Sequence, residues 1–464
     1  MRILQATILL ALATALTACA VGPRYHRPAF DTTAAYKEVD GWKPSEPADI
    51  LDRGPWWEIF GDDQLNSLEQ RLNISNETVK SAAAAVEEAR ALVRQSQAGL
   101  WPQITANASR DRTVTGAGNN AVTVNTVGVG ATWSIDIWGQ IRRQVEENQA
   151  SALASAAALA AARLSAQAQL ASDYFQLRAQ DQLQVILNDI VTAEQLSLKI
   201  TENRYRVGVA AKADVVSAQT QLLSSQSAQV NAPLQRALLE HAIAVLVGEQ
   251  PANFSIAATQ IRSDVPTVPA GLPSTLLERR PDVAEAERRV AAANAQIGVA
   301  MSAFFPSLTL SGSDDYRGNT ISRLIRTSNR VWSFGPSVAL SVFDFGLRRA
   351  QVAQARAAYE ASVDNYRQTV LTSLQQVEDE ITSLRVLEQQ ASVEDAAVKA
   401  AREAESLTLN QYKAGTVPYS SVITAQTTRL SSEETALNVL SNRLQASVAM
   451  IEALGGGWNS TMLR

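Results

Sequence analysis

Two stretches of 67 residues, over positions 140–206 and 347–413, contain neither proline nor glycine. These two residue types most often interrupt helices, so each stretch predicts one continuous helix. At 1.5 Å per residue, such a helix is roughly 100 Å long. A helix of this length needs partners packed along it. The chain is therefore predicted to be elongated and mainly helical.

The two stretches belong to an internal repeat with an offset of 207 residues. Tyr205-Arg206-Val207-Gly208 matches Tyr412-Lys413-Ala414-Gly415 at this offset. Further upstream, Trp101-Pro102 matches Phe305-Pro306 at an offset of 204 residues. Because solenoid repeats have periods of about 20–50 residues, a period of this size indicates duplication of a domain-sized unit.

Both copies have the same internal order. An alanine-rich amphipathic helix, over 76–99 and 282–302, precedes a β-hairpin, the long helix, a glycine turn and a shorter helix over 214–247 and 421–454. The hairpins are predicted from a period of two, in which apolar Trp332, Phe334 and Val338 alternate with small residues. Each copy is therefore predicted to be a β-hairpin inserted at one end of a long helical hairpin.

We divide the chain accordingly. Residues 1–18 are predicted to be a signal peptide, 19–64 an N-terminal arm and 458–464 a tail. Repeat 1 covers 65–260, with its β-hairpin at about 103–135 and its turn at about 206–213. Repeat 2 covers 261–457, with its β-hairpin at about 306–343 and its turn at about 413–420.

The start of the chain predicts a lipid anchor. Arg2 is followed by an apolar run, Ile3 to Leu16, that is too short to anchor across a bilayer. The sequence Leu16-Thr17-Ala18-Cys19 resembles the lipobox of bacterial lipoproteins, in which the cysteine takes a diacylglycerol. Ala20, by resemblance to bacterial sorting rules, directs the lipoprotein to the outer membrane. The alternative is an ordinary signal peptide with an incidental cysteine.

Composition argues against several functional classes. A net charge of −5 offers no field that attracts nucleic acid. The single cysteine excludes a disulfide framework, and the two histidines, His26 and His241, leave little for a zinc site or a Ser-His-Asp triad. We expect both histidines to be structural or solvated. The chain is therefore predicted to be no enzyme, and to carry no cofactor or metal apart from the covalent lipid.

Aromatic residues flank the predicted strands at the ends nearest the helices. They are Trp101, Phe304, Phe305, Trp133, Trp138, Phe343 and Phe345. Rings at one level resemble the interfacial girdle of membrane barrels. Four strands cannot close such a barrel, which needs about eight, so several chains must contribute. A dimer, a trimer or a tetramer would satisfy this requirement. A lipid-anchored periplasmic rod is the alternative, but it leaves the hairpins unexplained.

Several motifs carry a resemblance to a known family. They are Val21-Gly22-Pro23-Arg24-Tyr25-His26-Arg27-Pro28, Trp56-Trp57, Leu277-Glu278-Arg279-Arg280-Pro281-Asp282-Val283, Phe304-Phe305-Pro306 and Ala453-Leu454-Gly455-Gly456-Gly457-Trp458. From the lipobox to the last turn, the chain resembles the outer membrane factors of the TolC superfamily, of the lipoprotein kind typified by OprM and NodT.

The resemblance implies a mainly α fold with a β-barrel portion. It implies a homotrimer that forms a 12-strand β-barrel in the outer membrane of a Gram-negative bacterium, an α-helical barrel in the periplasm and an equatorial belt. Such a protein is a passive exit duct that docks on a periplasmic adaptor and an inner-membrane pump of the resistance-nodulation-division (RND) class. The alternative is the same duct serving a type I protein or oligosaccharide exporter with an ABC transporter.

The resemblance also implies where the duct closes. It identifies Val207, Gly208, Val209, Ala210, Ala414, Gly415, Thr416 and Val417 as adaptor-facing turns, and Asp214, Tyr412, Ser421 and Thr424 as a periplasmic gate. Asp214 is also suited to the positive end of a helix dipole. The resemblance brings it within reach of Tyr412 on a neighbouring hairpin. Ser421 and Thr424 stand where acidic residues are common in the family, so the gate is expected to be less charged.

Overall fold

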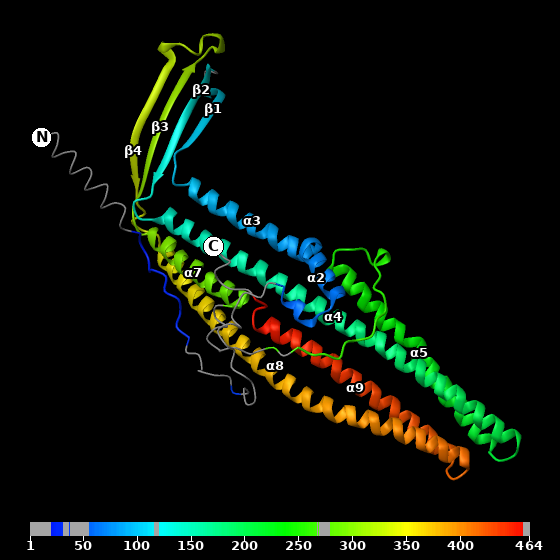
Figure 1. Ribbon diagram of the computed structural model, residues 1–464. Coiled ribbons are helices and arrows are strands. Elements are labelled where there is room, and N and C mark those ends of the chain that lie inside the picture. Colours follow the sequence, from blue (N-terminus) through cyan, green and yellow to red (C-terminus); the bar gives the residue numbers. More distant parts are fainter. Residues whose placement is uncertain are drawn as a thin grey trace. The chain divides into compact units, whose positions relative to one another are not determined.

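The computed structural model describes residues 20–30, 37, 55–115, 120–266, 268 and 279–457. In these ranges the chain is mainly helical, with one four-stranded antiparallel sheet (Figure 1). The predicted signal peptide, Cys19, most of the N-terminal arm and the tail lie outside the described residues. No helix in the described ranges is both long enough and hydrophobic enough to cross a bilayer.

The helices and strands follow the predicted order in both repeats. Repeat 1 contains α2 (Asp63–Ser75), α3 (Glu77–Ala98), β1 (Gln103–Thr115), β2 (Asn120–Ile135), α4 (Gln140–Arg206) and α5 (Lys212–Leu246). Repeat 2 contains α7 (Pro281–Ser302), β3 (Ser307–Gly318), β4 (Arg330–Ala339), α8 (Leu347–Ala414) and α9 (Tyr419–Ala453). Short 3₁₀ turns are η2 (Trp56–Phe60), η3 (Pro251–Asn253), η4 (Ile321–Arg323) and η5 (Thr327–Asn329).

The chain forms two compact units, and each is described by itself. The first unit comprises Met1–Phe30, Ala83–Ala157 and Ala284–Thr369, and the second comprises Asp31–Ala82, Ala158–Val283 and Val370–Arg464. Each unit takes segments from both sequence repeats. In the first unit this is because β2 of repeat 1 pairs with β3 of repeat 2, which joins the two β-hairpins into one sheet.

The sheet of the first unit has the strand order β1-β2-β3-β4. Gln103 is opposite Thr132 in the first pair, Ile135 is opposite Leu308 in the second and Ser307 is opposite Ala339 in the third. The strand ends that adjoin helices therefore lie at one end of the sheet. Strands β1 and β4 are its two edges, and edge strands in lipid require further pairing.

The core of the second unit explains the Trp56-Trp57 motif. Both indoles are buried, and the ring of Phe60 lies 4.8 Å from that of Phe175, centroid to centroid. This turn and α2 cover buried apolar residues of four long helices, namely Leu170, Tyr174 and Leu177 of α4, Ile243 of α5, Val377 and Ile381 of α8, and Leu444, Val448 and Ile451 of α9. The motif therefore belongs to one core that includes residues of all four helices.

Candidate functional site: the sheet, the N-terminal strap and the helical tip

The half of the sheet that adjoins the helices contains no charged residue. Its spans are 103–109 of β1, 127–135 of β2, 307–313 of β3 and 331–339 of β4, each seven to nine residues long. At about 3.3 Å per residue, they are roughly 23–30 Å long. With the tilt of about 35–45° that barrel strands have, this length spans roughly 16–25 Å along the membrane normal, and its upper end reaches the apolar band of about 25 Å that outer-membrane barrels present to lipid. We call it the charge-free band.

The predicted aromatic residues lie at the helix-side end of this band. Trp101, Phe304, Phe305, Phe343 and Phe345 are exposed. The remaining two indoles are half-buried: Trp133 Nε1 donates a hydrogen bond to the Leu100 carbonyl (2.9 Å), and Trp138 Nε1 donates to the Pro306 carbonyl (2.7 Å). Exposed rings at one level are the arrangement expected at a membrane interface.

Each strand-to-helix corner is held by an aspartate that the sequence reasoning missed. The Asp136 carboxylate accepts hydrogen bonds from the backbone N–H groups of Ile141 (3.1 Å) and Arg142 (3.0 Å) at the start of α4. Asp344 accepts from the N–H of Gly346 and pairs with Arg348 at the start of α8. The common signal is Asp, then Gly, then Arg, spaced three residues apart in the first copy (Asp136, Gly139, Arg142) and two apart in the second (Asp344, Gly346, Arg348).

Residues 20–25 form a strap across the first unit. The Val21 N–H donates to the Trp138 carbonyl (3.0 Å), and the Arg143 guanidinium donates to the carbonyls of Val21 (3.1 Å) and Gly22 (3.3 Å). Asn294 Nδ2 donates to the Pro23 carbonyl, and the Tyr25 hydroxyl donates to Glu287. Most of these bonds reach the backbone of the strap, so they fix its path independently of its side chains.

Glycines allow the strap to lie in close contact with the β2–α4 corner and with α7. A Cβ at Gly139 would lie 2.8 Å from Ala20 Cα, and a Cβ at Gly22 would lie 2.5 Å from Gly298 Cα. Real Cβ atoms do not approach other atoms so closely, and Gly22 also has a φ of +108°. Ala20, the residue after Cys19, is thereby placed at the β2–α4 corner, beside the helix-side end of the charge-free band.

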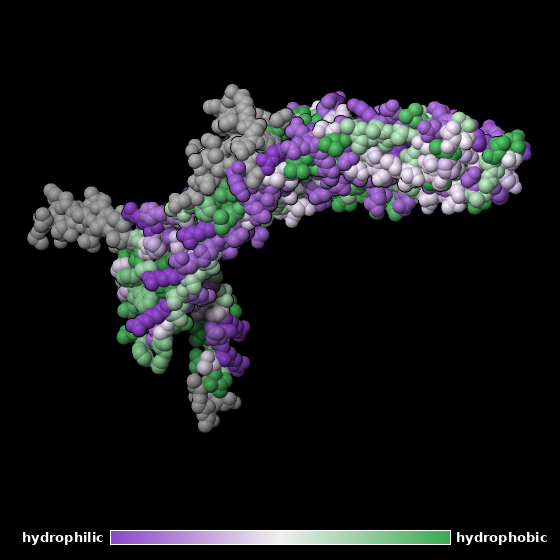
Figure 2. Space-filling view, turned by 90° about the horizontal axis from the view of Figure 1, so that it is seen from below, coloured by the Kyte–Doolittle hydropathy of each residue, from purple (hydrophilic) through white to green (hydrophobic). Residues whose placement is uncertain are grey.

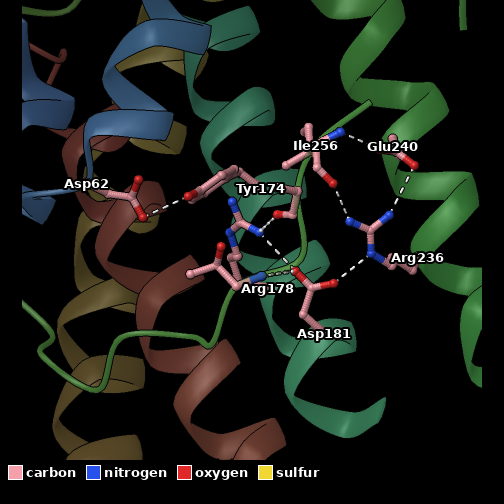
Figure 3. Close-up of polar contacts among 9 residues, drawn as sticks. Asp62, Tyr174, Arg178, Asp181, Arg236, Glu240 and Ile256 are labelled. Atoms are coloured by element: carbon pink, nitrogen blue, oxygen red, sulfur yellow. Dashed lines mark hydrogen bonds and ion pairs between the residues drawn. The ribbon is translucent and has the colours of Figure 1, made fainter. Parts of the chain in front are cut away.

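A buried ion-pair network in the second unit fastens the segment after α5 (Figure 3). The Asp181 carboxylate accepts from Arg178 (2.9 Å), from Arg236 (2.6 Å) and from the Thr259 N–H (3.2 Å). Arg236 and Glu240 of α5 bond the carbonyl and the N–H of Ile256. Because both backbone and side-chain groups of this segment are hydrogen-bonded, the network fixes the path of residues 256–259.

The same network reaches the start of α2. The Asp62 side chain caps this helix by accepting from the N–H groups of Gln64 (2.9 Å) and Leu65 (3.1 Å). Its second oxygen accepts from the Tyr174 hydroxyl (2.7 Å), and the Arg178 guanidinium lies 4.7 Å from the ring of that tyrosine. Burial raises the pKa of Tyr174. This part of the second unit is thus held by polar contacts as well as by its apolar core.

The two glycine turns have the same hydrogen bonds. Gly208 and Gly415 both have a φ of +79°. In the first turn, the N–H of Gly208 donates to the Tyr205 carbonyl and that of Val209 to the Arg204 carbonyl (both 2.9 Å). Gly415 and Thr416 repeat this pattern at the end of α8. Both turns are therefore Schellman caps, which end a helix at a left-handed residue.

Arg204 joins the two turns within one chain. Its Nη1 donates to the Lys413 carbonyl (2.7 Å), and its guanidinium lies 4.7 Å from the centroid of the Tyr412 ring. The buried Tyr412 hydroxyl donates to Thr201 Oγ1 (3.3 Å), and its ring meets Tyr419 edge-on. Burial raises the pKa of Tyr419, and Glu194, Tyr412 and Asp214 raise it further. We call this end of the four helices the tip.

The predicted gate residues all lie near the tip, in different surroundings. Asp214 is half-buried and accepts a hydrogen bond from the Ala211 N–H (3.4 Å). Ser421 is half-buried, whereas Thr424 is exposed and donates to the Ser420 carbonyl (3.0 Å). These bonds lie within one chain. The contact predicted between Asp214 and Tyr412 of a neighbouring hairpin stays a prediction.

The predicted adaptor-facing turns are mostly exposed. Val207 and Val209 are exposed apolar residues, and Figure 2 shows a hydrophobic patch at this end of the helices. The turn after α8 is also exposed at Ala414, Gly415 and Thr416, whereas Val417 is partly buried against Tyr412 and Tyr419. Ala210 is half-buried.

A buried polar cluster above the tip was also missed. Gln221 Nε2 donates to Glu194 (2.9 Å), and Gln426 Nε2 donates to Ser197 Oγ (3.0 Å). Burial raises the pKa of Glu194. The cluster also contains Arg429, which pairs with Glu405 (2.8 Å) and Glu433 (3.1 Å). Nothing local in the sequence distinguishes these residues from the many exposed Gln, Glu and Ser residues of the same helices.

Comparison with known proteins defines the class. The model of the family described as "Outer membrane efflux protein" matches residues 68–249 and 272–456. The chain belongs to this family. It is 31% identical to the pyoverdine export outer membrane protein OpmQ of Pseudomonas aeruginosa, over 89% of each chain. It is 28% identical to the probable efflux pump outer membrane protein TtgC of Pseudomonas putida, over 96% of this chain and 93% of that one.

Solved structures agree with this assignment. The outer-membrane channel OprN has a TM-score of 0.88 and 29% identity, and the match covers 95% of this chain and 100% of that one. The open-state MtrE channel of Neisseria gonorrhoeae has a TM-score of 0.83 and 25% identity, over 95% and 99% of the two chains. The superfamily and the fold class predicted from the sequence are confirmed.

The chain is therefore the outer-membrane channel of a tripartite efflux system. It forms a trimer with a β-barrel in the outer membrane and a helical barrel in the periplasm, and it works with a periplasmic adaptor and an RND pump. The names of the relatives favour efflux over the alternative of a type I exporter. The predicted outer-membrane location, the trimer, the adaptor and the pump are confirmed, whereas the lipid anchor stays a prediction.

Proposed function

We propose that this channel is a passive exit duct that carries out no chemistry of its own and needs no cofactor or metal. The charge-free band carries this proposal: it crosses the membrane as strands whose free edges pair between copies, which leaves a lumen. The scarcity of histidine and cysteine supports the absence of chemistry. Proteoliposomes test it: solute efflux should follow the concentration gradient alone. Accumulation against a gradient without a pump would contradict a passive duct.

We propose that Cys19 carries the lipid anchor. The support is that the strap places Ala20 at the β2–α4 corner, where an attached acyl chain starts beside the charge-free band. Each methylene buried in the membrane contributes about 0.8 kcal/mol to anchoring. Cells labelled with radioactive palmitate should yield a labelled wild-type protein and an unlabelled Cys19→Ser variant. An unlabelled wild type contradicts the proposal.

We propose that the tip closes the resting duct and that its two turns face the adaptor. The support is that Asp214, Tyr412, Ser421 and Thr424 gather at the end of the helices where Arg204 already joins the two turns. In the closed trimer the Tyr412 hydroxyl donates its proton to Asp214 of a neighbouring hairpin in place of Thr201, and this bond contributes about 1.5–3 kcal/mol if it is shielded from water. The adaptor offsets this bond by new contacts.

Planar-bilayer currents test the gate. Asp214→Ala and Tyr412→Phe are each expected to raise the resting conductance without lowering the trimer yield. The matched control is Tyr205→Phe, because Tyr205 is an exposed tyrosine of the same tip. Unchanged conductance in both gate variants would leave Asp214 with its helix-start role alone. Because Ser421 and Thr424 carry no charge, block by divalent cations is expected to be weak.

A further inference from the structure

The outer half of the sheet, beyond the charge-free band, carries an excess of positive charge, whereas the chain as a whole is negatively charged. The strands and the β3–β4 connection contain six arginines, which are Arg110, Arg112, Arg317, Arg323, Arg326 and Arg330. They contain only three aspartates, which are Asp111, Asp314 and Asp315. This excess of three positive charges occurs in a chain whose net charge is −5. All nine residues lie beyond the charge-free band.

Two of these arginines have acidic partners. Arg330 makes a two-pronged ion pair with Asp314, with both nitrogen–oxygen distances at 2.8 Å. Arg317 pairs with Asp315 at 3.2 Å.

The other four are Arg110, Arg112, Arg323 and Arg326, which we call the rim arginines. All are exposed, and their guanidinium groups make no hydrogen bond or ion pair with the described parts of the chain. Asp111 does not neutralise its neighbours, because successive strand residues point to opposite faces. The rim arginines are therefore available to an external anion.

An apolar hollow adjoins the rim arginines. The β3–β4 connection folds over β1 and β2 and forms a cavity of about 480 Å³ with them. Its apolar lining includes Ile321, Leu324 and Ile325 from the connection, with Ala108 and Val127 from the strands. Ile321 and Ile325 are 64% and 73% exposed, which is unusual for two isoleucines on one short connection.

The cavity also contains an unsatisfied polar atom. Asn125 is only 4% exposed and lines this cavity. Its Nδ2 donates to the Gly318 carbonyl (3.1 Å), but its Oδ1 accepts no hydrogen bond from any residue that the structure describes. A buried acceptor without a partner costs about 1–3 kcal/mol, so it indicates a donor from outside the described part of the chain. Arg110 lines the same cavity, directly opposite Asn125 in the β1–β2 pair.

We propose that this rim binds a phosphorylated lipid of the outer leaflet. The helices are periplasmic, so this end of the strands faces the outside, at the height where the charge-free band gives way to lipid headgroups. The rim arginines bind the phosphates, for which guanidinium has the matching two-pronged geometry. The cavity takes the start of an acyl chain, and Asn125 Oδ1 accepts a hydrogen bond from a headgroup hydroxyl or amide.

This site is independent of the duct and of the gate, since neither uses these residues. It lies beside β1, an edge strand that pairs with another copy in the trimer. A bound lipid would therefore sit next to a seam between subunits. We expect it to stabilise the assembled trimer as well as to fill the hollow.

Binding to the purified trimer in a neutral detergent tests the proposal. The probes are fluorescent lipid A, the same lipid without its phosphates, and inorganic phosphate as a competitor. Lipid A should bind, and loss of its phosphates should weaken binding by about tenfold or more. Inorganic phosphate at millimolar concentration should not displace it, because phosphate alone cannot fill the apolar cavity.

Substitutions locate the site. Arg323→Gln with Arg326→Gln, on the connection outside the strands, should weaken lipid A binding by about tenfold. Arg110→Gln with Arg112→Gln should have a similar effect, and lysine at the same positions should restore part of the affinity. The control is Arg94→Gln with Arg206→Gln, which removes the same charge from two exposed helix arginines and should leave binding unchanged.

Three results would overturn the proposal. They are equal binding of lipid A and its dephosphorylated form, unchanged binding by both rim pairs, and full displacement by inorganic phosphate, which would reduce the rim to a simple anion site. If the variant with Arg110→Gln and Arg112→Gln fails to assemble, the variant with Arg323→Gln and Arg326→Gln still tests the proposal, because these two residues lie outside the paired strands.

Discussion

Glu69 is the residue whose surroundings conflict most with its charge. It is fully buried on α2, and neither carboxylate oxygen has a hydrogen-bond partner among the described residues. Burial alone raises its pKa from 4.5 to about 9. The residue is therefore protonated in the folded protein at neutral pH and ionised in the unfolded chain.

This pKa shift makes stability depend on pH. Because the folded state holds the proton up to about pH 9 and the unfolded state releases it near 4.5, stability is greatest below pH 4.5 and falls as the pH rises through this window. Glu69→Gln keeps the shape without the ionisation. We expect it to raise the free energy of unfolding at pH 8 by about 1–3 kcal/mol.

Thermal unfolding at pH 5 and pH 8 checks this prediction. The variant's advantage should be large at pH 8 and small at pH 5. Glu77→Gln, at an exposed position at the start of α3, is the control and should show no such difference. A Glu69→Gln variant that is less stable than wild type at pH 8 would show that the carboxylate has a partner in the trimer.

The strap is an element whose position depends on one glycine of α7. A Cβ at Gly298 would lie 2.8 Å from the Val21 carbonyl oxygen and 2.9 Å from Arg143 Cγ. Gly298→Ala should therefore displace residues 20–23 and break the bonds from Arg143, at a cost of about 1–3 kcal/mol. Limited proteolysis should cut the variant near Arg24 faster than wild type.

The control for the strap is Gly335→Ala, since a Cβ there would meet nothing within 4 Å. This variant should resist proteolysis as wild type does. Equal proteolysis of Gly298→Ala and wild type would mean that the strap does not lie between α7 and Arg143.

A second prediction about a single element concerns the glycine turns at the tip. A Cβ at Gly208 would meet no atom within 4 Å, so Gly208→Ala causes no steric clash. Its cost in stability is that of holding a non-glycine residue in the left-handed conformation, about 1–2 kcal/mol. Amide hydrogen exchange of residues 203–209 should become faster by about tenfold. Gly208→Asn, which tolerates this backbone better, should show a smaller change. An equal effect of both variants would indicate a role for the missing side chain rather than for the backbone.

The sequence predicted elements better than it predicted contacts. The ends of helices α4 and α8 agree with the prediction to within one residue, because a long stretch without glycine or proline rarely forms anything but a continuous helix. The strand after Arg330 ends at Ala339, earlier than the alternation of residues 340–343 suggested, because Asp344 and Arg348 turn this segment into α8.

The contacts that hold the candidate sites could not be predicted. Arg143 bonds the backbone of Val21 and Gly22, more than 120 residues away, and Asp181 bonds Thr259 across 78 residues. Such bonds depend on tertiary placement, and backbone acceptors have no residue signature. The same holds for Tyr412, whose partner within the chain is Thr201, a residue that no motif singled out.

At the scale of the whole molecule, the four-stranded sheet requires other copies. Its edges β1 and β4 present unpaired backbone groups, which lipid does not tolerate. Three copies give the twelve strands of the barrel. A cysteine in β1 of one copy is therefore expected to form a disulfide with a suitably placed cysteine in β4 of another, and denaturing gels of oxidised membranes should show covalent trimers.

The central claim is that three copies enclose an open path across the outer membrane. The most direct measurement is the current through purified wild-type trimers in a planar bilayer. We predict discrete current steps of one size, absent from heat-denatured monomer. Intact trimers that insert into the bilayer and pass no current at any voltage would contradict the account.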